Sequence, residues 1–243
     1  MSSADIRGMF AGLPGAHGII EAALNGQGLV MTDDAAHPSS AAVLAGDFLF
    51  FGGEPSEALV RRALNAENRA WIVQGSNAFL ALVQAQRSGT WSERIAFDPH
   101  RQPEDAHLTA LLANLPQGVT LVPIGAAEMA FCRKTPWAAD FVNQFTEDEY
   151  ARSGLGVLVC ADGAFVSGAS SYAAYPGGIE VEVDTAPAHR GHGYATLAAA
   201  KLILTAHQQG KIATWDAANE TSAHIAQKLG YRVTCAYQVF TTA

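Results

Sequence analysis

The segment APAHRGHGYATLAAAKLILTAHQQG, residues 186–210, decides the fold of the second half of the chain. It follows IEVEVDT (residues 179–185), where apolar residues alternate with carboxylates, as in a strand with one polar face. After two closely spaced glycines, a run rich in Ala, Leu and Lys predicts a helix. Glycine lets the backbone approach a ligand closely, and the N-terminal end of a helix attracts anions. The segment therefore predicts a turn that binds a phosphate group.

Two common phosphate-binding patterns fit this turn poorly. Gly191-x-Gly193-x-x-Thr196 matches half of the dinucleotide fingerprint, with Asp216 placed to bind a ribose. However, Gly191 lies well beyond the end of the strand, and too little chain follows for the further β-α-β units of a doubly wound sheet. The Gly-Lys-Ser/Thr of a nucleotide-binding P-loop is absent. A nicotinamide-binding protein is kept as an alternative.

The rest of the chain indicates two parts of mixed α/β character. In residues 154–185, short β-type runs alternate with Asp-Gly, Ser-Gly and Pro-Gly-Gly breaks, which predicts an antiparallel meander. The apolar run in 41–53 predicts a buried strand. We expect a smaller N-terminal α/β domain over 1–118 and a second domain over 119–243, without a fixed-period repeat. Further elements are predicted as helices within 54–69, 77–89 and 104–118 and as strands at 70–75, 211–217 and 231–240, and the run 119–125 opens the second domain.

Composition restricts the class of protein. About half of the 243 residues are apolar, which suits a globular protein, and the formal charge of −8 argues against a nucleic-acid or membrane-surface partner. Three scattered cysteines without CxxC spacing are typical of a reducing compartment. No signal-peptide pattern and no membrane-length apolar run is present, so we expect a cytoplasmic protein. The histidines lack zinc-type spacing, so we expect no metal.

Two segments together carry a family resemblance. Arg190-Gly191-His192-Gly193-Tyr194-Ala195 resembles motif A of the GNAT (Gcn5-related N-acetyltransferase) superfamily, Arg/Gln-x-x-Gly-x-Gly/Ala at a strand-to-helix turn. WDAANETSAHIAQKLGYR (residues 215–232) resembles the superfamily's next segment: a strand, an Asn, a short helix and a closing Leu-Gly-aromatic. The resemblance covers about residues 120–243. It implies a mixed, mostly antiparallel sheet flanked by helices.

A narrower resemblance adds the first half of the chain. SGASSY, IEVEVDT and HRGHGYAT, together with GDFLFFGGEP in the N-terminal half, resemble the branch of zwittermicin A resistance-type acetyltransferases. That branch carries an extra N-terminal domain. For this chain the role of such a domain stays open: it covers the acceptor side, mediates formation of a homodimer, or is a degenerate copy of the same fold.

The resemblance implies acetyl-CoA as the cosubstrate. In the family it lies across the splayed ends of two parallel strands, which here are residues 179–185 and 211–216. The strand edge would pair with the pantetheine arm, and the turn would take the pyrophosphate. The residues at the matching positions are Val183, Thr185, Arg190, Gly191, His192, Gly193, Tyr194, Ala195, Thr196, Asn219 and Ser222.

Acyl transfer to an amine needs a base, because an ammonium must lose a proton before it can attack. We expect Glu182 and then Glu180 to serve, since bases of the family often sit on this strand; the alternative is that both are ordinary solvent-facing carboxylates. Many members have a Tyr seven residues after the Asn as the acid, but here that position is Ala226. Tyr231 is expected in the core, so no acid is assigned.

These observations predict an acetyl-CoA-dependent N-acetyltransferase that acts on a primary amine of a small molecule by direct attack. The acidic charge favours a cationic acceptor, such as an amino-sugar or amino-polyol antibiotic. The alternative from another class is an acyl-CoA-binding regulatory module without catalysis, which the missing Tyr at 226 keeps open.

Overall fold

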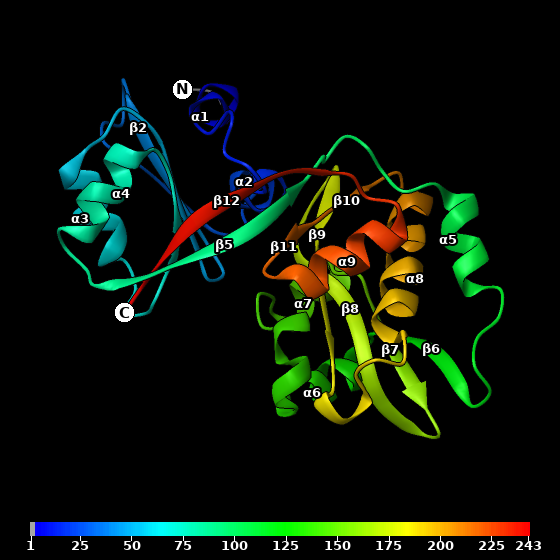
Figure 1. The fold of residues 1–243 in the computed structure, drawn as a ribbon. Helices are drawn as coiled ribbons and strands as arrows, with labels where there is room; N and C mark the ends of the chain where they lie inside the picture. The colour runs from blue at the N-terminus through cyan, green and yellow to red at the C-terminus, as the bar shows by residue number, and fades with distance from the viewer. Residues whose placement is uncertain (1–2) are drawn as a thin grey trace.

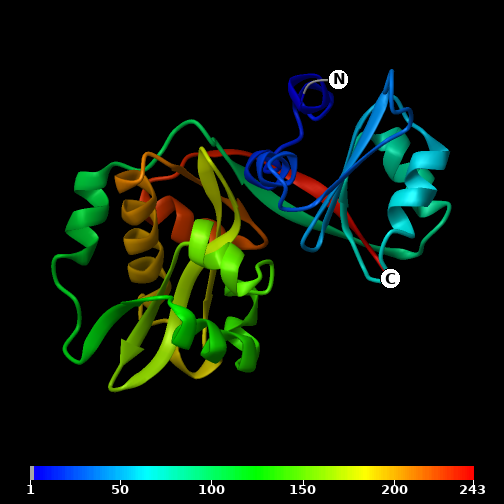
Figure 2. The same cartoon turned by 180° about the vertical axis from the view of Figure 1, so that it is seen from behind.

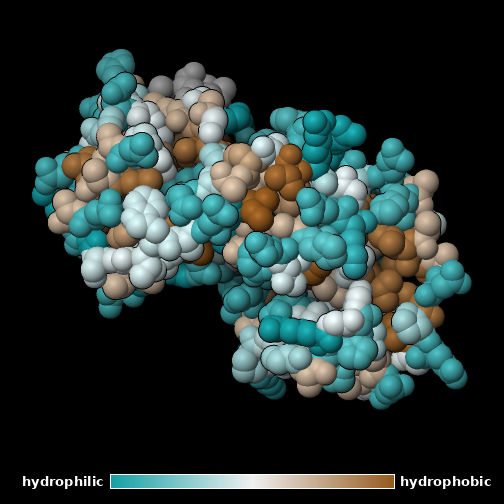
Figure 3. All heavy atoms as spheres, in the orientation of Figure 1, coloured by the Kyte–Doolittle hydropathy of each residue, from teal (hydrophilic) through white to brown (hydrophobic). Residues whose placement is uncertain are grey.

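The computed structural model describes residues 3–243, which form a mixed α/β protein with two sheets of seven and five strands. Each sheet is the centre of one body, and helices flank both (Figures 1 and 2). In the space-filling view the bodies are two lobes joined at a narrow waist (Figure 3). Two long strands, β5 (Gly89–Phe97) and β12 (Val233–Thr242), run from the first body toward the second.

The first body contains the seven-stranded sheet, with strand order β1-β2-β3-β4-β12-β5-β11. Helix α3 (Glu57–Leu64) illustrates why its helices form: the Ser56 side chain accepts a hydrogen bond from the Leu59 N–H, and one face of the helix is buried. The other elements are α1 (Ser3–Met9), α2 (His17–Leu24), β1 (Leu29–Thr32), β2 (Ser40–Ala45), β3 (Phe48–Gly53), β4 (Ile72–Gln74), α4 (Asn77–Gln84) and β11 (Asp216–Ala217).

The predictions for this region are confirmed in part. The helices within 54–69 and 77–89 and the strand at 70–75 are α3, α4 and β4. The buried strand predicted for the apolar run that ends the stretch 41–53 is β3, and a further strand, β2, precedes it; Gly46 with φ of 56° turns the chain between the two. Sequence reasoning missed β5, whose first half is exposed and polar.

The second body contains the five-stranded sheet, with strand order β10-β9-β8-β7-β6. The predicted meander is confirmed, since β7, β8 and β9 pair antiparallel; β9 and β10 are the parallel pair of this mostly antiparallel sheet. Its elements are α5 (Asp105–Leu112), β6 (Val119–Pro123), α6 (Ala126–Lys134), the 3-10 turn η1 (Pro136–Phe141), α7 (Glu147–Ser153), β7 (Gly156–Ala161), β8 (Ala164–Tyr175), β9 (Gly178–Thr185), η2 (Pro187–His189), α8 (Tyr194–Gln208), β10 (Ile212–Thr214) and α9 (Glu220–Leu229).

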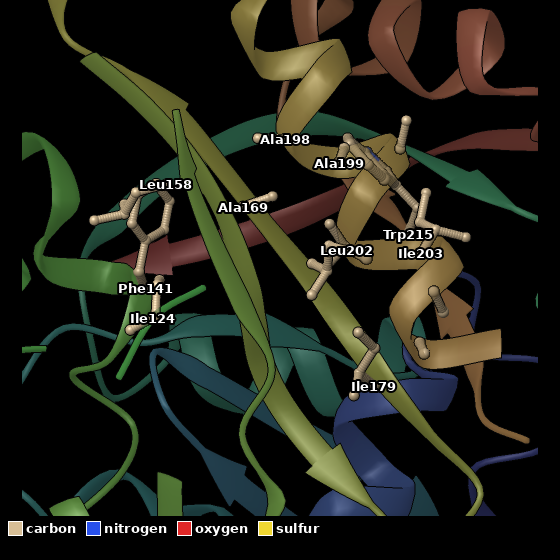
Figure 4. Close-up of a cluster of buried hydrophobic side chains, with 14 of the residues drawn as sticks. Ile124, Phe141, Leu158, Ala169, Ile179, Ala198, Ala199, Leu202, Ile203 and Trp215 are labelled. Atoms are coloured by element: carbon tan, nitrogen blue, oxygen red, sulfur yellow. The ribbon is translucent and has the colours of Figure 1, made fainter. Parts of the chain in front are cut away.

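Helix α8 covers one face of this sheet. Leu202 and Ile203 of the helix lie among the buried side chains of the strands, with Ile179 of β9 and Ala169 of β8 in the same cluster (Figure 4). Burial of this apolar face stabilises the helix that follows the glycine turn. The core therefore fixes the position of the turn at one end of β9.

The two halves repeat one order of elements. In each half, two antiparallel strands are followed by a helix and by a third strand that pairs parallel with the second strand. These elements are β2, β3, α3 and β4 in the first half, and β8, β9, α8 and β10 in the second. A further helix and a long final strand follow, α4 with β5 and α9 with β12. The repeat has no sequence period, so it becomes visible only in the topology.

The halves exchange their final strands. β12 pairs with β4 of the first half, and β5 pairs with β11 of the second half. The two final strands also pair with each other along their length, from Val233 opposite Phe97 to Thr242 opposite Gly89. Sheet membership therefore crosses the expected boundary at 118, and the division into 1–118 and 119–243 stays a prediction about folding units.

The exchange predicts that residues 1–118 alone will not unfold cooperatively, because β4 and β5 lack the strand that lies between them. The Asp98 N–H donates to the Arg232 carbonyl, so a short Gly-rich turn can join residues 1–98 to residues 232–243. This joined fragment is expected to show a steeper urea transition by circular dichroism than 1–118. A cooperative transition of 1–118 alone, equal to that of the joined fragment, would contradict the prediction.

Candidate active site

The two parallel strands of the second body separate shortly after they pair. β10 and β9 pair at three positions, the last being Thr214 opposite Glu180. Beyond this point the chain passes through Trp215 into β11, which joins the other sheet. The edge of β9 after Glu180 is thus left open on the side of β10, and a groove begins there.

A cavity of about 440 Å³ lies at this opening. Every residue predicted to bind the cosubstrate lines it: Val183, Thr185, Arg190, Gly191, His192, Gly193, Tyr194, Ala195, Thr196, Asn219 and Ser222. Sequence reasoning missed the contributions of Thr221, Ile225 and Lys228. Their spacing on one face of α9 was the signal that could have found them. The structure brings the predicted set together; what the set binds stays a prediction.

The glycine turn is built to receive a ligand. Gly191 and Gly193 have φ of 81° and 80°, a region that side chains disfavour, and Gly193 is the residue before the first turn of α8. A Cβ atom at either glycine would meet nothing within 4 Å, so the space over the turn is open. The N–H groups of the first helical turn point toward this space and favour an anion.

Arg190 turns back toward the strand instead of pointing along the groove. Its Nε donates to the Thr185 carbonyl at 3.2 Å, and its Nη2 lies 3.4 Å from the Asp184 carboxylate. The His192 ring stacks on Tyr194, with the ring centres 5.5 Å apart. These contacts hold the shape of the turn.

Asn219 and Ser222 have structural partners in the free protein. The Asn219 side chain caps α9 by accepting the Ser222 N–H at 2.9 Å. The Ser222 hydroxyl in turn accepts the Trp215 Nε1–H at 3.1 Å. This chain of bonds fixes the start of α9 on the wall of the groove.

The open edge of β9 presents backbone donors. The Val183 N–H donates to the Glu182 carboxylate at 3.2 Å, and the Thr185 N–H donates to the Asp184 carboxylate at 2.6 Å. Each donor is therefore bonded to the side chain of the residue before it. Such contacts can be exchanged for a ligand without breaking the sheet.

A second cavity, of about 150 Å³, lies where the two bodies meet. It is rich in carboxylates, and the first half of the chain supplies much of its wall. Its charged lining residues are Asp47, Arg94, Asp140, Glu180, Glu182 and Asp216, and its apolar and aromatic lining residues include Ile19, Phe48, Ile72 and Tyr172. Glu182 links the two cavities, because it lines the second and bonds the N–H of Val183 in the first.

Glu180 is fully buried, and this burial raises its pKa to about 8. It is hydrogen-bonded to the Thr214 hydroxyl, which also donates to the Ile179 carbonyl at 3.0 Å. One hydroxyl proton cannot serve both oxygens, so a protonated Glu180 that donates to Thr214 completes the chain. Glu180 is thus held as a neutral acid at neutral pH.

Glu182 is less enclosed. Its pKa is raised to about 7, mainly by burial and also by repulsion from the neighbouring Asp140 and Asp184 carboxylates. The Val183 N–H and the more distant Arg94 act in the opposite direction. A carboxyl that titrates near pH 7 can take and release a proton under neutral conditions. Glu180 is buried and therefore not solvent-facing, and Glu182 is partly buried; a catalytic role for either stays a prediction.

At this cavity, β5 and α2 of the first half contact Asp216 and Glu180, and Tyr237 of β12 lies beside Asp216. The Arg94 Nε on β5 donates to the Asp216 carboxylate at 2.6 Å, and its guanidinium lies 5.1 Å from the centre of the Phe48 ring. Tyr237, opposite Arg94 in the strand ladder, lies beside the same carboxylate. Helix α2 packs on Glu180, where a Cβ on Gly18 would lie 2.4 Å from the carboxylate oxygen.

The two positions considered for a general acid, Ala226 and Tyr231, are both buried. The Tyr231 hydroxyl donates to the Ala213 carbonyl at 2.7 Å. Of the three thiols, Cys132 is buried, Cys160 is partly buried and Cys235 is exposed. Within residues 3–243, His, Cys, Asp and Glu side chains form no group suited to hold a metal ion. None of the helices in that part of the chain has the length and apolar character needed to cross a membrane.

Comparison with known proteins identifies the family. A model of the GNAT acetyltransferase family matches residues 9–240. A GCN5-related N-acetyltransferase-like protein from Streptococcus suis is 31% identical, with a TM-score of 0.88 over 99% of this chain and 98% of that one. No curated protein matches the chain.

More distant structures share the fold. A GCN5-related N-acetyltransferase from Kribbella flavida is 21% identical, with a TM-score of 0.57 over 86% of this chain and 89% of that one. A tandem GNAT protein from the clavulanic acid biosynthesis pathway is 14% identical, with a TM-score of 0.56 over 100% and 96% of the two chains. The repeated topology, the glycine turn and the family match together show that this chain belongs to the GNAT acetyltransferase family.

Proposed function

We propose that this protein transfers an acetyl group from acetyl-CoA to a primary amine of a small cationic molecule. The observation that carries the proposal is the position of Glu182 between an open anion-binding groove and a carboxylate-lined cavity. The groove suits the cosubstrate, and the cavity suits an ammonium group. A cytoplasmic location and the absence of nucleic-acid and membrane partners belong to the same proposal.

The residues present fit acetyl-CoA. Open space over Gly191 and Gly193 and the N-terminal end of α8 suit the pyrophosphate, and the free edge of β9 suits an extended pantetheine arm. Lys228 adds a positive charge to the groove. When bound, acetyl-CoA would supply the acetyl group as an activated thioester.

Glu182 is the base of this proposal. An ammonium in the second cavity would be attracted by the Glu182 and Asp140 carboxylates, and Glu182 would take its proton so that the neutral amine can attack. Glu180 is already protonated at neutral pH and is hydrogen-bonded to Thr214, so it shapes the cavity instead of accepting the proton.

Backbone donors would stabilise the negative charge that develops on the acetyl oxygen. When the ammonium draws Glu182 toward the second cavity, the Val183 N–H is released from its carboxylate partner and becomes available at the edge of β9. We assign no acid for the leaving thiolate, because a thiol with an ordinary pKa of ~8.5 can leave unprotonated.

The acceptor is proposed to be a cationic amine, for example an amino-sugar or amino-polyol antibiotic. The sequence resemblance to the zwittermicin A resistance-type branch and the acidic cavity support this choice. The alternative is a module that binds acyl-CoA without catalysis; the absence of a Tyr at position 226 favours it. Homodimer formation stays a prediction.

Release of CoA from acetyl-CoA across a panel of small amines tests the proposal directly. We expect kcat/KM to rise with pH through about 7, because Glu182 must be deprotonated to act. Glu182→Gln should lower kcat/KM at pH 7 by about 100-fold or more. Glu93→Gln, on an exposed position of β5, is the matched control and should keep activity. Binding of acetyl-CoA without CoA release for any amine would favour the binding module.

Gly193→Val should abolish the groove, because the new side chain enters the open space and the left-handed backbone disfavours it. We expect affinity for acetyl-CoA to fall by about 30-fold, which corresponds to ~2 kcal/mol, in calorimetric titration. Gly163→Val is a matched control: Gly163 has φ of 83° and equal open space, but lies in the turn between β7 and β8. Equal losses in both variants would show that strain, and not the groove, explains the effect.

Glu180→Gln should stabilise the fold at alkaline pH. The folded pKa is raised from 4.5 to about 8, so the folded state binds the proton more tightly and its stability falls as pH rises through this window. Gln does not titrate and can still donate to Thr214. The variant should therefore gain stability relative to the parent between pH 5 and 8.5 in urea unfolding. The exposed control Glu67→Gln should show no such gain, and a constant difference for Glu180→Gln would refute a buried neutral acid.

A further inference from the structure

The second cavity, where the amine acceptor is proposed to bind, is lined by one guanidinium and five carboxyl groups. We call it the acceptor cavity. Arg94 lines it together with Asp47, Asp140, Glu180, Glu182 and Asp216. Arg94 is on β5, a strand of the first half that lies between β12 and β11 in the seven-stranded sheet. The side chain is only 13% exposed and is bonded to Asp216, whose side chain is 3% exposed. Burying a charged side chain costs folding free energy unless the charge is paired and hydrogen-bonded, as Arg94 is with Asp216.

We propose that Arg94 is a positioning residue that balances the charge of this cavity and keeps Glu182 able to accept the proton of the amine. This inference rests on the proposed function, and it assigns the first half of the chain a part in the chemistry. Arg94 does not contact the reacting atoms. It acts through its charge and through the position of Asp216.

Geometry supports the role. The Arg94 Nε holds one Asp216 oxygen at 2.6 Å, its Nη2 lies 3.4 Å from the Asp216 carbonyl, and the guanidinium lies over the Phe48 ring. The opposite member of its strand pair, Tyr237, borders the same carboxylate. These contacts fix the guanidinium in one place, so its field on the cavity is constant.

The groups that face Glu182 come from every element around it. They are Glu180 and Asp184 of β9, Asp140 of η1, Tyr172 of β8, Arg94 of β5, Asp216 of β11, and Asp47 of the turn between β2 and β3, which is paired with Arg69. Asp140 and Asp184 disfavour the carboxylate form of Glu182, and Arg94 favours it. Asp216 neutralises part of the Arg94 charge. Removing either member of this ion pair should therefore affect Glu182 in opposite directions.

The test compares Arg94→Gln with Asp216→Asn. The first removes the positive charge, and the titration midpoint of Glu182 should rise by about one pH unit; the second leaves the guanidinium unopposed, and the midpoint should fall. The midpoint is measured in the protein alone by carbon NMR of labelled glutamate, with Glu182→Gln to identify the signal. Arg94→Lys should restore the parental value, and the exposed Arg62→Gln should not change it.

The same shifts should appear in the acid limb of the pH profile of kcat/KM. Circular dichroism checks that each variant is folded; if Arg94→Gln is not folded, the expected fall of the Glu182 midpoint in Asp216→Asn still tests the inference. The inference would be overturned if the Glu182 midpoint moved in the same direction in Arg94→Gln and Asp216→Asn, or if it moved in neither variant. Absence of CoA release by the parent protein would instead refute the proposed function, because the NMR titration needs no substrate.

Discussion

The pairing of β5 with β12 is the constraint on which the rest of the structure depends. These are the final strands of the two halves, and each also pairs with a strand of the other half. The seven-stranded sheet would be incomplete without the exchange, because β12 lies in it between β4 and β5. Because Arg94 and Tyr237 lie opposite each other in this ladder, the pairing places both beside Asp216, and Arg94 and Asp216 line the second cavity. The connection that holds the bodies together thus also builds the site.

The two copies of the fold have diverged at the turn after their second strand. In the second half, nothing lies within 4 Å of a Cβ placed on Gly191 or Gly193. In the first half, a Cβ on Gly53 would lie 2.1 Å from the Ser39 carbonyl, and the chain continues with Glu54 before α3. That turn is filled by its own chain and carries negative charge where an anion would bind. Residues of the first half line the second cavity, while the open glycine turn is found in the second half.

How much the sequence predicts depends on how local the signal is. The turn after β9, the meander and the family resemblance lie in contiguous residues, so most of the groove lining was predicted residue by residue; Thr221, Ile225 and Lys228 were missed. Arg94 and Asp140 lie far from Glu182 in sequence and come to it only through the strand exchange and η1, so no spacing could reveal them. The strand β5 was missed because its exposed polar residues lack alternation. The neutral state of Glu180 also needed the structure, since it depends on burial beneath α2 and on the bond to Thr214.

The most direct test of the account is a crystal structure of the protein with CoA and a small diamine. We expect pyrophosphate oxygens on the N–H groups between Gly191 and Thr196, the thiol at the edge of β9 near Val183, and an ammonium between Glu182 and Asp140. In that complex the Val183 N–H should no longer bond to Glu182. CoA bound elsewhere, or an ammonium outside the cavity between the two bodies, would contradict the central claim that the exchanged strands assemble the acceptor side of the site.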